Sequence, residues 1–172
     1  MLSTHRDSYQ ECQVFTNKLK QLDLRAIAYQ LMYSDEGKKW TLEETNQGIS
    51  NYLMFLYLIY LYPHLQLVPT QEIDRVWHHH ILDTIKYAED CEFLFGRFIH
   101  HFPYFGKRGK VDRDHLYKAC TETQKLFQEH FSIDLAVGEE FSQMTDCQPV
   151  VNVKNMIRPF VDVDMNFFQF AA

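Results

Sequence analysis

A run of apolar and aromatic residues from Tyr52 to Tyr62 constrains the fold more than any other feature of the chain. A helix needs about 20 apolar residues to span a bilayer, so this run is too short for that role, and Pro63 ends it. A helix that is apolar on every side is buried when it belongs to a globular protein. We therefore expect this segment to form a helix in the centre of the domain, with no membrane association.

Helical periodicity continues on both sides of this run, and each segment has one apolar face. Thr41 with Glu44, and Thr70 alone, stand where side chains cap the starts of helices. The segments predicted to be helical extend up to about residue 22 and over residues 23–32, 40–62, 70–96 and 111–131. The sequence therefore predicts a mainly α protein, a single-domain bundle of about five or six helices.

The composition changes after the last predicted helix. Residues 150–153 and 160–164 have the β-branched composition of strands, and the aromatic end at 167–170 is unfavourable in water. We expect an irregular or short-stranded C-terminal tail. Residues 1–134 would form the helical domain, and residues 135–172 an extension that packs on this domain or on a partner, including a second copy of the chain.

The charge balance excludes some partners. The net charge is −6 and the isoelectric point is near 5.8, which opposes binding to nucleic acid or to an anionic membrane. Only residues 107–110 form a basic patch. The four cysteines have no CxxC spacing, so a cysteine-based zinc site is not expected. No secretory signal precedes them, which favours free thiols in a cytoplasmic protein.

The segment after Pro69 carries the candidate chemistry. At about 100° per residue, Ile73 and Trp77 share one apolar face of a helix, and Asp74 points roughly into it. A carboxylate in such a place costs several kcal/mol unless it is paired or bound to a metal. His78 follows Asp74 by one turn, so the two side chains can share a ligand or a hydrogen bond.

The side chains of the three consecutive histidines point to different sides of the predicted helix. We expect His79 to face solvent and His80 to lie on the apolar face, whereas His78 lies at the edge of that face. His78 and His80 are roughly 200° apart on a helix, so they do not chelate one ion together. A metal site therefore needs a further ligand from another part of the chain.

That ligand is expected downstream, where Gly96 ends the helix and Pro103 prevents its continuation. His100 and His101 would then lie in the turn that brings the chain back. Asp74 and His78 with His101, or with His100, match the mixed histidine and carboxylate sets of zinc and non-haem iron. The alternative is a metal-free hydrogen-bond network in which Asp74 orients the histidines.

Two functions follow from these alternatives. The first is a metal-dependent enzyme, hydrolytic or oxidative, that acts on a small molecule or a peptide, with His80 or His100 as the catalytic acid or base. Cys91 is excluded as a nucleophile for His80, because eleven residues span roughly 16 Å along one helix. The second is a non-catalytic interaction module with structural histidines and a partner-binding aromatic tail.

The sequence also resembles a known family. The motif Trp-His-x-His at 77–80, followed by Asp90-Cys91 and by His100-His101, resembles the glycine-rich domain-containing protein-like family, in a short, stand-alone, bacterial-type form. The resemblance covers about residues 40–110. It implies that His78 and His80, and not His79, belong to the site. It implies a fold and a set of site residues but no reaction.

Overall fold

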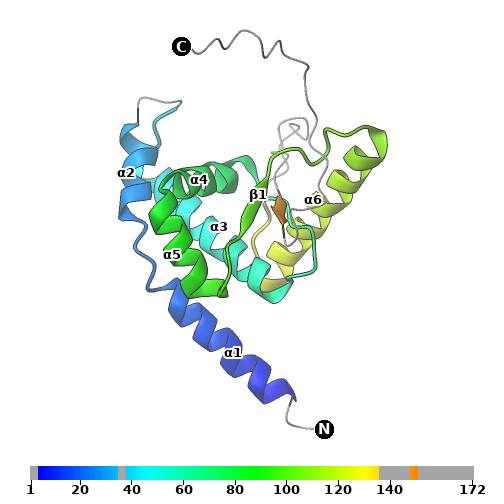
Figure 1. Cartoon of the computed structure of the whole chain (residues 1–172), viewed down its shortest axis with the longest axis horizontal. Helices are drawn as coiled ribbons and strands as arrows, with labels where there is room; N and C mark the ends of the chain where they lie inside the picture. The colour runs from blue at the N-terminus through cyan, green and yellow to red at the C-terminus, as the bar shows by residue number, and fades with distance from the viewer. Residues whose placement is uncertain (1–3, 35–37, 136–147, 151–172) are drawn as a thin grey trace, which may run out of the picture.

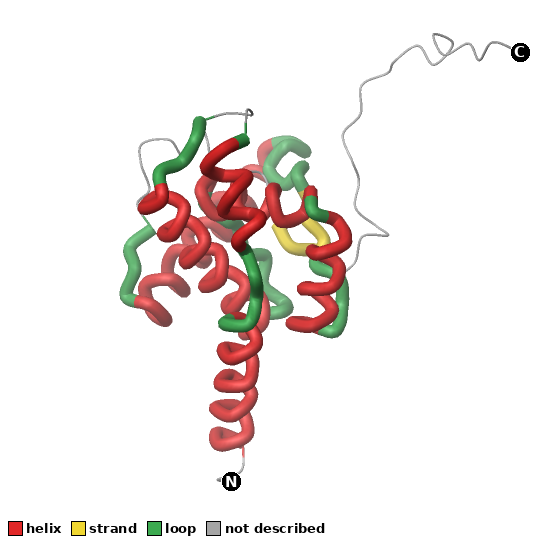
Figure 2. Tube along the Cα trace, turned by 90° about the vertical axis from the view of Figure 1, so that its left-hand side faces the viewer, coloured by secondary structure: helices red, strands yellow, loops and turns green. Residues whose placement is uncertain are grey.

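The computed structural model describes residues 4–34, 38–135 and 148–150, and in these ranges six helices and two short strands are present (Figure 1). The mainly α prediction is confirmed. The elements are α1 (Thr4–Leu19), α2 (Arg25–Tyr33), α3 (Leu42–Leu61), α4 (Gln71–Leu82), α5 (Thr84–Phe95), β1 (His100–Phe102), α6 (Lys110–Phe131) and β2 (Gln148–Val150). The helices form one bundle, from which the N-terminal part of α1 projects (Figure 2).

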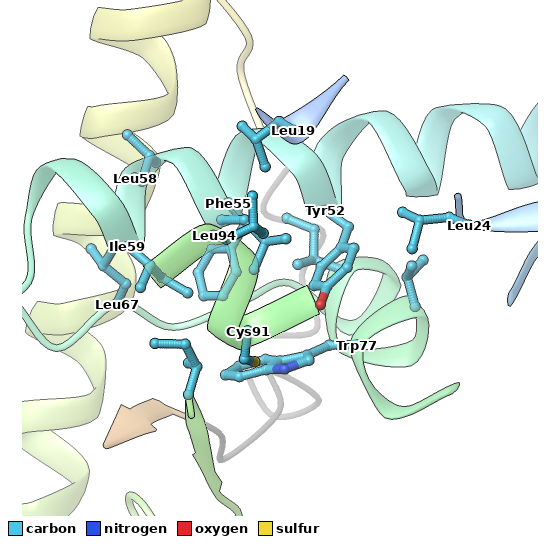
Figure 3. Packing of buried hydrophobic residues seen from close by; sticks show 14 of the residues in the cluster. Leu19, Leu24, Tyr52, Phe55, Leu58, Ile59, Leu67, Trp77, Cys91 and Leu94 are labelled. Atoms are coloured by element: carbon cyan, nitrogen blue, oxygen red, sulfur yellow. The ribbon is translucent and has the colours of Figure 1, made fainter. Parts of the chain in front are cut away.

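Helix α3 is the centre of this bundle, as its sequence predicts. It contacts α1, α2 and α4, and every residue from 51 to 62 is buried or half-buried. Aromatic and branched side chains of α3 fill the core between these helices (Figure 3). The most deeply buried are Tyr52, Phe55, Leu56, Leu58 and Ile59. Among the described residues, no helix is long and apolar enough to cross a membrane.

The predicted caps are confirmed. The Thr41 side chain accepts a hydrogen bond from the backbone N–H of Glu44, and the Glu44 carboxylate accepts one from the backbone N–H of Thr41. The Thr70 side chain accepts a hydrogen bond from the N–H of Ile73 at the start of α4. Gly96 ends α5 with φ of 62°, a left-handed conformation that favours glycine.

The prediction of one helix over residues 70–96 is wrong. Asp83 has φ of −81° and ψ of 74°, outside the helical region, so α4 ends before it and α5 begins after it. The break lets α5 pack against α4 and buries Tyr87, Cys91 and Leu94. Burial of these side chains offsets the few helical hydrogen bonds that the break removes. A straight helix would instead carry them away from α4.

Residues His100 and His101 lie in a strand and not in the predicted turn. β1 pairs with β2 in antiparallel orientation, with His101 opposite Pro149 and His100 opposite Val150. The strand prediction at 150–153 is met at Val150, and the remaining predicted strand residues lie outside the described ranges. The division into a domain at 1–134 and an extension at 135–172 stays a prediction.

A second, smaller core joins β1 to α6. It is built of buried side chains from β1, from the loop after it, from α6 and from the segment before α4. Its members are Val68, Phe102, Phe105, Leu116, Ala119 and Cys120. The buried Thr123 side chain of α6 also accepts a hydrogen bond from the N–H of Val68, at 2.9 Å. This core fixes β1 against the bundle from one side.

Gly48 allows α3 to approach Trp40 closely. A methyl group added at Gly48 would lie 2.9 Å from Trp40 Cη2, nearer still to Cζ3, and 3.4 Å from Cγ2 of Val76. The Arg75 guanidinium lies over the Trp40 ring, with its Cζ 5.1 Å from the ring centroid. Gly48 is therefore a packing requirement at this point of α3.

We expect Gly48→Ala to lower the free energy of unfolding by about 1 kcal/mol. The clash with the indole costs about 1–3 kcal/mol, which exceeds the gain of about 1 kcal/mol in helix propensity. In a Trp40→Ala background the same substitution should be stabilising, because the clash is gone and the propensity gain remains. Urea denaturation of the four proteins of this double-mutant cycle tests the coupling. Stabilisation by Gly48→Ala in the wild-type chain would contradict the packing.

Candidate metal site

Helix α4 presents Asp74 and His78 on the same side. Asp74 lies in the first turn, where the positive end of the helix dipole favours a carboxylate, and its N–H donates to the carbonyl of Thr70 at 2.8 Å. His78 is four residues further, and its Nδ1 lies 3.1 Å from Asp74 Oδ2. The Asp74 side chain is 4% exposed and the His78 side chain is 50% exposed. The pair therefore reaches from the interior to the surface.

The third residue comes from β1. After α5 ends at Gly96, the chain turns back and brings His101 beside α4. Nε2 of His101 lies 2.9 Å from Asp74 Oδ1, and the His101 side chain is 9% exposed. The rings of His78 and His101 are tilted against each other, with their centroids 4.6 Å apart. The structure thus brings together the three residues that the sequence predicted as metal ligands.

Ligand atoms of this Asp74–His78–His101 group lie within 4.8 Å of one another. One carboxylate oxygen and two imidazole nitrogens are a donor set that zinc and iron(II) accept. The same geometry also gives the carboxylate partners without an ion, because His101 Nε2 is hydrogen-bonded to Asp74 Oδ1 and His78 Nδ1 lies at ion-pair distance from Oδ2. The arrangement is compatible with metal binding and with a hydrogen-bond network.

The electrostatic setting of His78 favours its neutral form. Burial lowers the pKa of His78, the Asp74 carboxylate raises it in part, and the neighbouring His101 lowers it further. The balance is a pKa below the ordinary value of histidine. Neutral imidazole is the form that binds a metal, so no proton has to be removed from His78 at neutral pH.

His100 is not part of the group. Successive side chains of a strand point to opposite sides, so His100 and His101 diverge. The His100 ring instead contacts the ring of Phe98, with centroids 4.9 Å apart. Of the two residues that the sequence left open as the third ligand, the structure brings His101 to Asp74. The proposed acid or base role of His100 stays a prediction.

His80 belongs to a separate, buried polar group. Its Nδ1 lies 2.9 Å from the Tyr52 hydroxyl and its Nε2 lies 2.9 Å from Asp90 Oδ2. Lys86 donates to the same Asp90 oxygen at 2.7 Å. The His80 side chain is 1% exposed, and burial lowers its pKa while Asp90 raises it in part. Both ring nitrogens are engaged, and the catalytic role of His80 stays a prediction.

His79 is more shielded than expected. The sequence predicts a solvent-facing side chain, whereas the residue is half-buried and His78 is the most exposed of the three consecutive histidines. Helix α4 contacts α2, α3 and α5, and these neighbours cannot be placed from the periodicity of α4 alone. His78 and His80 have different partners, Asp74 and Asp90, which agrees with the expectation that they do not bind one ion together.

The break at Asp83 removes the distance argument against Cys91. Asp90 contacts His80 although ten residues separate them, so the length of a straight helix is no guide here. Cys91 interacts with the Tyr87 hydroxyl and with the backbone of Ile99, and burial raises the pKa of its thiol. Cys91 is therefore kept protonated. Among the described residues, Cys12, Cys91 and Cys120 are not joined in disulfides.

Sequence reasoning missed the residues that connect these groups. Asp90 as the partner of His80, and Tyr87 as the partner of Trp77, depend on the angle between α4 and α5. The two residues of each pair are ten positions apart, roughly 15 Å along a straight helix, so only a bend in the helix brings them into contact. A single straight helix could not predict either pair.

The chain is similar to glycine-rich domain-containing protein 1 of Arabidopsis thaliana, with 34% identity over 68 residues. The similar region is 37% of this chain and 8% of that protein, so the chain spans a small part of its relative. No protein-family model and no solved structure matches the chain. The similarity supports the resemblance to glycine-rich domain-containing proteins, and membership of a bacterial-type form stays a prediction.

We expect Asp90→Ala to lower the free energy of unfolding by about 2–3 kcal/mol, because it leaves a buried imidazole nitrogen and a largely buried ammonium group without their shared acceptor. Glu89→Ala removes an exposed carboxylate from the position next to Asp90 on α5 and should change stability by less than about 0.5 kcal/mol. Urea denaturation of both variants measures the difference. Equal, small effects would mean that the His80 group contributes little to stability.

Proposed function

We propose that this protein binds one divalent metal ion, zinc or iron(II), through Asp74, His78 and His101. The observation that carries the proposal is the convergence of a buried carboxylate and two imidazoles from two separate elements, with ligand atoms within 4.8 Å. Helix α4 supplies two of the ligands and β1 supplies the third. The chemistry of the donors is that of zinc and non-haem iron sites.

The distances support this assignment. Ligands about 2.0–2.2 Å from an ion lie roughly 3–3.5 Å from one another in tetrahedral or octahedral geometry. Two separations in the group are near this range, 2.9 Å from Asp74 Oδ1 to His101 and 3.1 Å from Asp74 Oδ2 to His78, and they involve different oxygens of the carboxylate. Since the ligand atoms lie within 4.8 Å of one another, an ion would draw the side chains together and bind the ring nitrogens that face Asp74.

The exposure of the three residues supports a reactive site. Asp74 and His101 are almost fully buried, whereas half of the His78 side chain is exposed, so an ion has one side towards solvent. Three protein ligands leave at least one position for water or substrate. We propose on this basis a metal-dependent enzyme, hydrolytic with zinc or oxidative with iron, with a small-molecule or peptide substrate.

The alternative is a non-catalytic interaction module. It is favoured by the contacts of Asp74, whose Oδ1 is hydrogen-bonded to His101 and whose Oδ2 lies 3.1 Å from His78 Nδ1. In that case the histidines stabilise the fold, and the C-terminal residues 135–172 would supply the contact with a protein partner or with a second copy. The two proposals differ in one measurable property, the presence of stoichiometric metal.

Metal content of untagged protein is the decisive test. We expect about one ion per chain in the wild type after reconstitution with zinc or with iron(II) under anaerobic conditions. Asp74→Asn, His78→Gln and His101→Gln should each lose most of it, because each removes one of three ligands. His79→Gln on the same helix and His100→Gln on the same strand are matched controls that should retain it. Elemental analysis after gel filtration gives the ratios.

The opposite result has an equally clear form. Wild-type protein without stoichiometric metal, together with His78 and His101 variants that are less stable, would identify a hydrogen-bond network and favour the interaction module. Loss of metal in the control variants as well would indicate adventitious binding to surface histidines. Either result would remove the basis for a search for hydrolytic or oxidative activity.

A further inference from the structure

We infer that Tyr87 and Trp77 are positioning residues of the Asp74–His78–His101 group. In this inference the Tyr87 hydroxyl, bonded both to the Trp77 indole and to the backbone just before β1, sets where His101 lies relative to α4. The inference rests on the proposed metal site for one of its two measurements. The other measurement concerns the histidine itself and needs no metal.

The three residues of the group need a contact that fixes their relative positions, because they lie on different elements. Asp74 and His78 are fixed relative to each other by one turn of α4. His101 is on a three-residue strand that follows a left-handed glycine and a short connection. Neither α4 nor β1 determines by itself the distance of 2.9 Å between Asp74 and His101. A contact between the two elements has to do so.

The Trp77 indole provides the first part of this contact. It lies on α4 between the two ligands of that helix in sequence, and it is fully buried. The indole and the His101 ring are packed edge to face, with centroids 4.7 Å apart and an angle of 75° between the ring planes. Rotation of the His101 ring towards Trp77 is therefore blocked, and the orientation of the indole sets the orientation of the histidine.

The Tyr87 hydroxyl provides the second part. It accepts a hydrogen bond from Trp77 Nε1 at 2.9 Å and donates one to the carbonyl of Ile99 at 2.5 Å. Ile99 precedes His101 by two residues, and Trp77, Tyr87 and Ile99 are all at most 2% exposed. One oxygen atom thus joins α4, α5 and the chain that enters β1. Water has no access to replace either bond.

Loss of the Tyr87 hydroxyl should weaken the binding of an ion, because residues that orient metal ligands affect metal affinity. Residues that orient metal ligands without contacting the ion change metal affinity by about 10–100-fold when they are removed. Tyr87→Phe removes only the hydroxyl and keeps the ring contacts with His80 and Phe98. Any change at the site must then arise from the lost bonds of the hydroxyl, of which those to Trp77 and Ile99 lead to α4 and β1 and the one to Cys91 stays within α5.

Tyr52 supplies a matched control. Its hydroxyl is also fully buried and also makes a hydrogen bond, at 2.9 Å to His80 Nδ1. That bond leads to Asp90 and Lys86 and not to β1. Tyr52→Phe should therefore cost comparable stability and leave His101 where it is. A role of Tyr87 in stability alone predicts that the two variants behave alike.

The experiment compares wild type, Tyr87→Phe and Tyr52→Phe by cobalt(II) and zinc titration of the full chain. We expect Tyr87→Phe to raise the metal dissociation constant about 10–100-fold, and Tyr52→Phe to change it less than about twofold. The cobalt absorption spectrum should change in shape for Tyr87→Phe, because the angle of the His101 ligand changes. Equal affinities and spectra for both variants would overturn the inference.

A second measurement, on metal-free protein, separates this inference from the proposed function. Long-range nitrogen–proton NMR spectra report the tautomer of each histidine. We expect His101 to be protonated at Nε2 in the wild type and in Tyr52→Phe, and to be a tautomer mixture in Tyr87→Phe. An unchanged His101 in Tyr87→Phe would overturn the inference, even if the wild type binds metal. Absence of metal binding with a changed His101 would overturn only the proposed function.

If Tyr87→Phe does not fold, Trp77→Phe takes its place. This substitution removes the indole N–H and its bond to Tyr87 but keeps an aromatic ring at the same position on α4. We expect the same loss of tautomer selection at His101 and the same direction of change in metal affinity. A Trp77→Phe protein with wild-type His101 signals would contradict the inference in that case.

Discussion

The burial of Trp77 is the interaction on which the rest of the structure depends. Its ring packs on Phe55 of the central helix, with centroids 5.7 Å apart (Figure 3). It also packs on His101 of β1. Its only polar atom, Nε1, is satisfied by Tyr87 of α5. One side chain therefore joins α3, α4, α5 and β1. A large aromatic residue with one donor is well suited to this, because it combines extensive apolar contact with one directional bond.

Two polar groups with different properties lie near this tryptophan. The Asp74–His78–His101 group has one half-exposed member and can exchange an ion or water with solvent. The His80 group has both imidazole nitrogens engaged inside the protein, and its carboxylate is shared with Lys86. Consecutive histidines on one helix thus serve different purposes, because a rotation of roughly 200° separates His78 from His80. Only the first group has the exposure and the donor set of a metal site.

Local features of this fold follow from the sequence, whereas contacts between distant segments do not. The caps at Thr41 and Thr70, the end of α5 at Gly96, the buried α3 and the direction of Asp74 depend on neighbours within one or two turns, and all were predicted. The break at Asp83 was not predicted, because it is stabilised by contacts between α5 and α4. The pairing of β1 with β2 joins residues far apart in the chain and has no local signal.

The sequence by itself determined the helical class, the central apolar helix and the sharing of one helix side by Asp74 and His78, because helical spacing and burial of apolar residues are enough for these. It also limited the candidates for the third ligand to two neighbouring residues, His100 and His101. Only the tertiary structure decided that His101 and not His100 meets Asp74, since strand alternation and the Trp77 contact orient it. The hydrogen bond between Tyr87 and Trp77 likewise forms only because the chain bends at Asp83. This bend is stabilised by packing between helices and not by local propensity.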